Sequence, residues 1–491
     1  MLFTTIEFLV FFVFVIGVIS TIRYRKFQHT LLLSASYFFF FFSSNYLLAL
    51  LIFSTLLDFY AGRAIWNNKN IRTKKIILAL SLAGNVGLLG FFKYADFGIA
   101  QLNSLGNLLG FGPEIPLLNI VLPIGISFYT FQSMSYTIDI YRGKLEPSKS
   151  LGEFALFVAF FPQLVAGPIL RAKDFLPQLR EKIKNFGSEQ NIRQILIHDS
   201  NLKMGITIMS FGFLKKMFFA DNIAPFVNEV FQNPIGLDSF AIVLGTIAFG
   251  IQIYCDFSGY SDIAIGAALI LGFKIPLNFN KPFFATSPSD FWGRWHISLS
   301  TWVRDYLYYP LIFKNRKSDV IVYSSLLFSM LLMGLWHGAS WNFVIWGGLH
   351  GIFLATHTII KRKFPQISLH PFFQRNTGRI FSVIATQYLV FFTFISFRVQ
   401  DFDHMWYSMQ KYVLWDFATE QVVELVALNK FPVILIIIFF ILNFASYKHG
   451  DLPKAIANIK LRYWFSFLGS VLMLVLIFET GPAQDFIYFK F

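Results

Sequence analysis

Cysteine is almost absent from this sequence, with Cys255 the only one in 491 residues. An intrachain disulfide and a metal site built from cysteines are therefore excluded. Charged side chains are also scarce, at 14% of residues, whereas soluble proteins average about 25%. The sequence has no P-loop, no dinucleotide-binding fingerprint, no HExxH zinc motif and no nucleophile elbow. These deficits argue against soluble enzymes of the corresponding classes.

Apolar residues are abundant instead, at 55% of the chain, and 63 phenylalanines raise the aromatic fraction to 19%. Apolar stretches of roughly 17 to 25 residues recur along the chain, each long enough to cross about 30 Å of hydrocarbon. Their long aliphatic runs lack the alternating pattern of an outer-membrane barrel. We therefore predict an all-α polytopic membrane protein with about 11 transmembrane helices plus re-entrant and interfacial helices.

The basic residues that produce a net charge of +14 fall in short clusters between the apolar runs. Such clusters mark the cytoplasmic loops of membrane proteins, so we predict no nucleic-acid partner. The first apolar run precedes its charges, Arg23, Arg25 and Lys26, which is the reverse of a secretory signal peptide. We expect an uncleaved first span near residues 4–21, with the N-terminus and the C-terminus both outside.

Some segments of the first half depart from a simple alternation of spans and loops. Residues 31–60 begin and end beside basic loops, which predicts two short helices with a turn at residues 43–45. Residues 76–92 are predicted to span, and residues 96–116, which lack Lys and Arg, to form an outside loop. The prolines and glycine of residues 154–169 predict a broken, re-entrant helix.

In the second half, residues 226–240 and 398–430 are expected to form outside loops, the latter with amphipathic character. No soluble domain and no short repeat are visible in the sequence. We predict a single integral-membrane domain over residues 1–491. Its parts are N-terminal spans, a catalytic core and C-terminal spans, at residues 1–118, 119–358 and 359–491.

Polar residues inside apolar segments are costly in a membrane, and three groups of them are present. The first lies in TSPSDFWGRWHISLSTWVRDYLYYPL, where Ser287, Pro288 and Asp290 form a typical helix start. Helical spacing puts His296 on the aromatic, inward face of a predicted interfacial helix. The helix could instead be a plain anchor whose histidine bonds to a carbonyl. The charged residues lie mostly off that face: Arg294, Arg304 and Asp305.

The second group surrounds the histidine of MGLWHGASWNF, which follows the predicted span 318–336. His337, next to Trp336, should lie deep in the protein at a glycine-rich bend, with Ser340 and Asn342 as hydrogen-bonding candidates. It could transfer protons in a shielded tunnel or merely bond to backbone groups freed at the bend. A continuous helical phase would turn His350 to roughly the opposite face, so it is the weaker candidate of the two.

The third group is QIYCDFSGYSDIAIGAALILGF, where Asp256, Ser258 and Asp262 lie within a predicted span and Gly259 is a candidate break. Two carboxylates there could act as acid and base, coordinate a cation, or bond to structural partners. Cys255 is interpreted as a small apolar filler rather than an acyl carrier. Residue physics alone leaves two functions open, an acyl-transferring enzyme and a proton-coupled transporter.

Five segments together resemble the membrane-bound O-acyltransferase (MBOAT) superfamily. Within it they are most similar to the membrane subunit of bacterial alginate O-acetyltransferases. The resemblance runs from about residue 120 to the C-terminus, and Cys255 is its one visible departure, since an aromatic residue is expected there. The segments are FFPQLVAGPILRAKDFLPQL, QIYCDFSGYSDIAIGAALILGF, FNKPFFATSPSDFWGRWHISLSTWVRDYLYYPL, GLWHGASWNFVIWGGLHG and FIYFKF.

The resemblance implies an O-acetyltransferase in the bacterial cytoplasmic (inner) membrane, with acetyl-CoA as the donor substrate and no bound cofactor or metal. It implies transfer towards an extracytoplasmic polysaccharide, commonly through a periplasmic acetyltransferase partner. D-alanyl or other acyl transfer to teichoic acid or peptidoglycan is the alternative. His337 is implied as the catalytic residue and His296 as the second functional position. The supporting or channel-lining candidates are Asn342, Ser340, Trp336, Asp256, Ser258, Asp262, Arg304 and Asp305.

Overall fold

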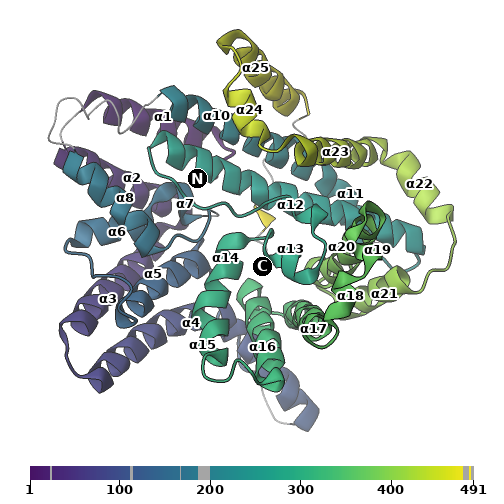
Figure 1. The fold of residues 1–491 in the computed structure, drawn as a ribbon, viewed down its shortest axis with the longest axis horizontal. Coiled ribbons are helices and arrows are strands. Elements are labelled where there is room, and N and C mark those ends of the chain that lie inside the picture. The colour runs from purple at the N-terminus through teal and green to yellow at the C-terminus, as the bar shows by residue number, and fades with distance from the viewer. Residues whose placement is uncertain (23–24, 111–113, 166, 186–198, 479–485, 488–491) are drawn as a thin grey trace. The chain divides into compact units, whose positions relative to one another are not determined.

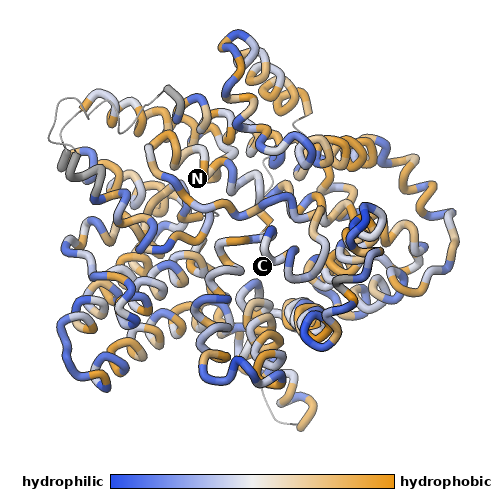
Figure 2. The backbone as a smooth tube through the Cα atoms, viewed as in Figure 1, coloured by the Kyte–Doolittle hydropathy of each residue, from blue (hydrophilic) through white to orange (hydrophobic). Residues whose placement is uncertain are grey.

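A computed structural model describes residues 1–22, 25–110, 114–165, 167–185, 199–478 and 486–487. All regular secondary structure in these ranges is helical (Figure 1). Seven helical stretches are long and apolar enough to cross a membrane, and two shorter apolar helices, Ile6–Thr21 and Leu461–Ile477, accompany them. The predicted all-α polytopic class is confirmed, while the count of about 11 spans stays a prediction. Figure 2 shows apolar residues along the long helices and hydrophilic residues gathered near their ends.

The chain forms two compact units. Unit 1 comprises Met1–Met209 and Ser261–Pro276, and unit 2 comprises Ser210–Tyr260 and Leu277–Phe491. The single-domain organisation expected from the sequence stays a prediction. The helices of unit 1 are α1 (Ile6–Thr21), α2 (Arg25–Ser44), η1 (Asn45–Leu47), α3 (Leu48–Asn67), α4 (Ile71–Leu109), α5 (Ile126–Tyr141), α6 (Leu151–Ala159), α7 (Phe161–Leu164), α8 (Ala172–Asn185) and most of α10 (Asp199–Phe213).

Two predicted interruptions of unit 1 are present. The turn near residues 43–45 is the 3-10 turn η1, where Asn45 takes a left-handed backbone with φ 49°. The segment 154–169 is broken at Phe160, between α6 and α7, one residue before α7 begins and two before Pro162. Asn45 tolerates the left-handed backbone of the first break, and Pro162 in the first turn of α7 has no N–H with which to continue the helix from α6.

The predicted outside loop at residues 96–116 is wrong over most of its length. Helix α4 continues for 39 residues to Leu109 and ends at Gly110, which has φ 72°. A lack of Lys and Arg indicates only the side of the membrane, and isolated glycines in a helix cost about 1 kcal/mol each. The helix therefore continues past its internal glycines and ends only at Gly110, which adopts the left-handed C-cap conformation.

Unit 2 holds all the candidate site residues except Asp262. Its elements follow from η2 through the C-terminal helices, shown from teal to yellow in Figure 1. They are η2 (Leu214–Ala220), α11 (Asp221–Gln232), the first part of α12 (Ser239–Ile270), η3 (Pro282–Phe284), α13 (Pro288–Trp292), α14 (Ile297–Val303), η4 (Arg304–Tyr308), α15 (Tyr309–Ile312), α16 (Asp319–His337), α17 (Trp341–Lys363), α18 (Pro365–Leu369), α19 (Pro371–Gln374), α20 (Asn376–Arg398), α21 (Phe402–Val413), α22 (Glu420–Leu428), α23 (Lys430–His449), α24 (Leu452–Ala457) and α25 (Leu461–Ile477).

Two further expectations need correction. The outside loop predicted at residues 226–240 is helical as far as Gln232. Gly259 does not break its span, since α12 is continuous from Ser239 to Ile270. A Cβ on Gly259 would lie 2.8 Å from the carbonyl oxygen of Gly212 and 3.0 Å from the amide nitrogen of Lys216. This glycine therefore permits close approach of a neighbouring helix rather than a break.

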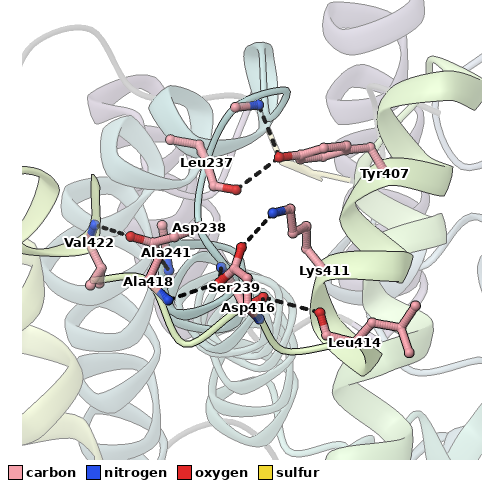
Figure 3. A network of polar contacts seen from close by, with 11 residues as sticks. Leu237, Asp238, Ser239, Ala241, Tyr407, Lys411, Leu414, Asp416, Ala418 and Val422 are labelled. Carbon is pink, nitrogen blue, oxygen red and sulfur yellow. Dashed lines mark hydrogen bonds and ion pairs between the residues drawn. The ribbon is translucent and has the colours of Figure 1, made fainter. Parts of the chain in front are cut away.

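The segment 398–430 forms the helices α21 and α22 and docks on the start of α12 (Figure 3). Asp238 accepts hydrogen bonds from the amides of Ala241 and Val422, at 2.7 and 2.9 Å, and so caps α12 while holding α22. Asp416 accepts from the amide of Ser239 and pairs with Lys411. The amphipathic character predicted for this segment is confirmed, because one face of α21 is buried.

Helices α16 and α17 form a closely packed hairpin with Trp336, His337 and Gly338 at the end of α16 and the start of its turn. A Cβ on Gly334 would lie 2.2 Å from the carbonyl oxygen of Phe343, and one on Gly347 would lie 2.3 Å from that of Met330. Real Cβ atoms do not approach backbone so closely, so both positions require glycine for the hairpin to close.

We expect Gly347→Ala to lower the stability of unit 2 by about 1–3 kcal/mol, the usual range for overpacking. The matched control is Gly348→Ala, whose Cβ would meet only the Leu331 side chain at 3.5 Å. Because alanine favours helix, the control should be neutral or stabilising by up to about 1 kcal/mol. Thermal unfolding in detergent measures both, and equal midpoints would contradict the close approach.

Candidate active site

His296 and His337 lie against the same indole, that of Trp336. Ring centroids are 6.1 Å apart for His296 and Trp336 and 5.0 Å apart for Trp336 and His337. His296 immediately precedes α14, and His337 is the last residue of α16. Their side chains are buried, at 1% and 4% relative exposure. Segments about forty residues apart in the sequence therefore bring both predicted histidines to one aromatic cluster.

His296 does not ride on a continuous helix as the sequence analysis expected. The Ser287 cap is confirmed, since its hydroxyl accepts from the amide of Asp290 at 3.2 Å, but α13 ends at Trp292. His296 then takes a left-handed backbone with φ 41° before α14 begins. The break re-aims the chain so that the imidazole meets the ring of Phe257, 4.6 Å away and edge-on. The helical spacing of aromatic residues correctly predicted that His296 points inward, but it did not predict the break in the helix.

Burial lowers the pKa of His296 to about 3, because an apolar environment disfavours the imidazolium. The ring is therefore neutral at every physiological pH. A base of such low pKa is a poor proton acceptor near pH 7, so His296 is suited to orienting a partner or holding a hydrogen bond.

The stability of the protein should depend on pH through His296. In the unfolded chain histidine titrates near pH 6.5, so between about 6.5 and 3 only the unfolded state gains this proton. The contribution is fully present above pH 6.5 and is lost as pH falls, by up to about 1.4 kcal/mol per pH unit. His296→Asn should remove this slope and keep the fold, because asparagine tolerates a left-handed backbone. Unfolding midpoints at pH 7.5, 6.5 and 5.5 measure it, and parallel curves would contradict burial of a neutral ring.

His337 ends α16 at the predicted bend. Gly338 follows in an extended conformation, and Ser340 caps α17 by accepting from the amide of Asn342 at 3.3 Å. The imidazole packs between Trp346 and Phe397, with ring centroids at 4.9 and 5.2 Å. The glycine-rich bend expected from the sequence is confirmed.

Ser340 and Asn342 have structural partners of their own. The amide group of Asn342 donates to the carbonyl oxygens of Val399 and Gln400, at 2.6 and 2.8 Å, which fastens the start of α17 to the end of α20. The hydroxyl of Ser340 is the cap of α17. These contacts support the positions of His337 and Phe397, and the predicted role of Ser340 and Asn342 as hydrogen-bonding groups near His337 stays a prediction.

His350 was wrongly placed on the opposite face. The helical phase is broken between residues 338 and 340, so it cannot be carried from His337 to α17. Within α17, Trp346 and His350 are four residues apart and share one face, with ring centroids at 4.8 Å. His350 is buried, and its Nε2 lies 2.9 Å from the Thr393 hydroxyl. Trp346 thus contacts both His337 and His350. The i, i+4 spacing within α17 was the signal that could have found it.

A cavity of about 370 Å³ opens beside this cluster. Two of its lining residues are close in sequence to the histidines. Met333 lies one helical turn before His337, and Ile297 directly follows His296. Arg304 is the one charged side chain among its described lining residues, and its Nε is paired with Asp305 at 2.9 Å. The lining residues are Ser289, Trp292, Gly293, Ile297, Ser300, Thr301, Val303, Arg304, Tyr308, Leu326, Ser329, Met330, Met333 and Leu354. An apolar chamber with one cation suits an acyl chain or thiol arm that carries phosphate at its far end.

Two buried indole N–H groups at the cluster have no acceptor among the described residues, those of Trp292 and Trp346. Trp292 lines the cavity, and its ring contacts those of Trp346 and His350 at 5.8 and 5.1 Å. Buried donors without acceptors are costly, so such groups commonly serve a ligand. They are suited to a carbonyl oxygen that gains negative charge.

Comparison with known proteins decides the family. The model of MBOAT, the membrane-bound O-acyltransferase family, matches residues 146–399, which include both histidines. The "Probable alginate O-acetylase AlgI" of Azotobacter vinelandii is 36% identical over 444 residues, covering 88% of this chain and 83% of that protein. This chain belongs to the membrane-bound O-acyltransferase family.

Other relatives carry different names. The "Peptidoglycan O-acetyltransferase" of Helicobacter pylori is 36% identical over 344 residues, 65% of this chain and 62% of that protein. The "Teichoic acid D-alanyltransferase" of Bacillus subtilis is 29% identical over 304 residues, 60% of this chain and 72% of that protein. The chain is thus a multi-pass membrane O-acyltransferase, which decides between the enzyme and the transporter left open by the sequence.

This acyltransferase holds the predicted Asp256 in a buried ionic network. Its Oδ1 lies 2.7 Å from the ammonium of Lys216, which also contacts Asp221 at 2.7 Å. Its Oδ2 accepts from the amide of Ile487 at 2.7 Å. The exposures of the Lys216 and Asp256 side chains are only 1% and 4%. Sequence reasoning missed Lys216, which lies forty residues earlier on a π-helical turn.

Phe486 and Ile487, near the C-terminus, are therefore buried in unit 2. The ring of Phe486 lies 5.6 Å from that of Phe257, which contacts His296. The other residues of the tail predicted to lie outside, 482–485 and 488–491, fall beyond those the structure describes. Asp256 thus holds Ile487, and the neighbouring Phe486 contacts Phe257, whose ring in turn contacts His296.

Two further candidates, Ser258 and Asp262, lie on α12. Ser258 is buried on α12, and Asp262 lies six residues beyond Asp256, turned by about 240° around the same helix. Cys255 is buried, as expected for an apolar filler, although its role stays a prediction. Within the described residues, no group of three or more His, Cys, Asp or Glu side chains could hold a metal ion.

Proposed function

We propose that this enzyme transfers an acetyl group from acetyl-CoA to a hydroxyl of an extracytoplasmic polysaccharide, from within the bacterial cytoplasmic membrane. The observation that carries the proposal is the arrangement of His337, buried against Trp336 and Trp346 one helical turn from an apolar cavity. The names of the alginate and peptidoglycan O-acetylating relatives support the acetyl group and a glycan acceptor.

The donor would occupy the cavity between α14, α16 and α17. The guanidinium of Arg304, beside Tyr308 in the lining, would attract the phosphates of CoA. The thiol arm would follow the apolar wall past Met330 and Met333 towards the histidines. Exclusion of water there protects the thioester from hydrolysis.

His337 would act as the general base. Its imidazole accepts the proton of the attacking hydroxyl while the hydroxyl oxygen bonds to the thioester carbon. The resulting oxyanion would be stabilised by the indole N–H groups of Trp292 and Trp346. Collapse expels the CoA thiolate, which takes back the proton from the imidazolium and leaves the acetyl ester. His296, neutral because of its low pKa, would orient the thioester or a relay group.

A periplasmic acetyltransferase partner would complete delivery to the polysaccharide. The acyl group must leave a buried centre and reach a polymer too large for a cavity of about 370 Å³. A relay through a second protein solves this mismatch of size. We place both termini and the receiving side of the enzyme outside, following the distribution of basic loops.

The second candidate is D-alanyl transfer to teichoic acid, favoured by the resemblance to a named D-alanyltransferase over 60% of this chain. The same base and oxyanion donors would serve either acyl group, because in both reactions a hydroxyl attacks the carbonyl carbon of an activated acyl group. What differs is the donor and the acceptor.

Inside-out membrane vesicles that contain the enzyme and a co-expressed periplasmic partner test the proposal. Labelled acetyl-CoA added to the exposed cytoplasmic face should yield base-labile labelled esters on the enclosed polysaccharide, and right-side-out vesicles should not. Transfer from an activated D-alanyl donor, with none from acetyl-CoA, would replace this function by the second candidate. No transfer from either donor would overturn both.

A further inference from the structure

A second, larger pocket of about 800 Å³ lies on the other side of α13 and is not used by the proposed reaction. It is formed by α13, the end of α17, α18, α19 and the start of α20, which lie together in Figure 1. Ser289 and Trp292 of α13 face the first cavity, whereas Ser287 and Asp290 face this one. The helix therefore forms a partition between two different chambers.

Positive charge dominates this pocket. Its lining includes Arg294, Lys361, Arg375 and Arg379, against the single carboxylate of Asp290. Asp290 is committed to Arg294, whose Nε lies 2.6 Å away. Among the described residues, Lys361 and Arg375 have no carboxylate partner, so the pocket keeps unbalanced positive charge.

Large, partly exposed apolar side chains also line the pocket, and we call them its apolar rim. The lining contains Ile360, Phe364, Ile367, Phe373 and Phe381, with relative exposures between 37% and 56%. A soluble phosphate compound needs no such rim, whereas an amphiphile with a phosphate head and acyl chains fits both parts. The pocket also lies where α17 ends and α20 begins, two helices long and apolar enough to span a membrane.

The geometry points to this pocket as a binding site for the phosphate headgroup of an anionic phospholipid, with its acyl chains along the apolar rim. Basic pockets between membrane helices recognise such headgroups through charge-assisted hydrogen bonds. Lys361 and Arg375 bind the phosphate. Arg379 is held in place by its hydrogen bond to the Tyr447 hydroxyl and its position over the Tyr447 ring.

The site is connected to the catalytic cluster through α13. Ser289 Oγ lies 3.0 Å from Nδ1 of His357 on α17, and the ring of Phe291 stacks on His350 at 6.0 Å. A headgroup bound along the polar edge of α13 would therefore stabilise the position of Phe291 and Trp292, which contact His350 and Trp346. The lipid is a positioning ligand, and its binding does not depend on which acyl group is transferred.

The test compares lipids on the purified full-length enzyme. Thermal unfolding is followed in detergent micelles titrated with phosphatidylglycerol or phosphatidylcholine. Phosphatidylglycerol should raise the midpoint and phosphatidylcholine should not. Lys361→Gln and Arg375→Gln should each raise the half-saturating lipid concentration by about fivefold, and the double variant should raise it by about 25-fold. The matched control is Lys363→Gln, an exposed neighbour outside the pocket, which should keep the wild-type response.

Other results would overturn the proposal. An equal response to both lipids, or an undiminished response in the double variant, would remove the headgroup site. Inorganic phosphate or CoA producing the same midpoint shift through Lys361 and Arg375 would assign the pocket to a soluble phosphate ligand instead. Arg375→Lys, which keeps the charge, should recover most of the affinity and separates charge recognition from damage to the fold.

Discussion

Replacing His337 by glutamine should lower acyl transfer by about 10²- to 10⁴-fold, the range typical for loss of a general base. Glutamine preserves much of the volume between Trp346 and Phe397, so the hairpin should fold normally. The measurement is the content of base-labile esters in polysaccharide from cells that produce each variant at equal membrane abundance.

The matched control is His449→Gln, an exposed histidine at the end of α23, which should leave ester content unchanged. His350→Gln is a more informative companion, because His350 contacts Trp346 without contacting the proposed donor cavity. A well-folded His337→Gln enzyme with normal ester content would exclude His337 as the base.

Replacing Lys216 by methionine should lower stability by about 3–5 kcal/mol, the usual cost of removing one partner from a buried ionic group. Asp256 and Asp221 would then both lose their cation inside the protein. The additional change Asp256→Asn should recover part of the loss, because it removes one uncompensated charge while the side-chain oxygen can still accept from the Ile487 amide.

Lys411→Met is the surface comparison for this prediction. Lys411 and Asp416 form a partly exposed ion pair, which water and salt screen, so its loss should shift the unfolding midpoint little. Thermal unfolding in detergent measures all three variants. A Lys216→Met protein as stable as the Lys411→Met protein would contradict a buried network.

Much of this structure could be predicted from local chemistry. Ser287 with Pro288 marked a helix start, and the glycines around His337 marked a bend, because such residues act within one helical turn. The charge and apolar patterns were sufficient for the membrane class. The buried positions of both histidines could be predicted because titratable side chains are conspicuous in apolar segments.

The errors share a physical cause, which is that tertiary contacts decide where a helix breaks. Gly259 looked like an interruption but serves close packing against Lys216. His296 looked like a residue within a helix but sits in the left-handed link before α14. The partnership of Lys216 with Asp256 was invisible because nothing local relates residues forty positions apart.

Helix α4 also sets a length scale for unit 1. Its 39 residues extend about 58 Å at 1.5 Å per residue, whereas a whole bilayer measures about 40–45 Å with its headgroups. Unless it tilts steeply, this rod stands out of the lipid at one end. Near its C-terminal end, Asn103 exchanges two hydrogen bonds with the backbone of Ile115, which holds the returning chain against α4. That end is a suitable place for a reporter of which side of the membrane it occupies.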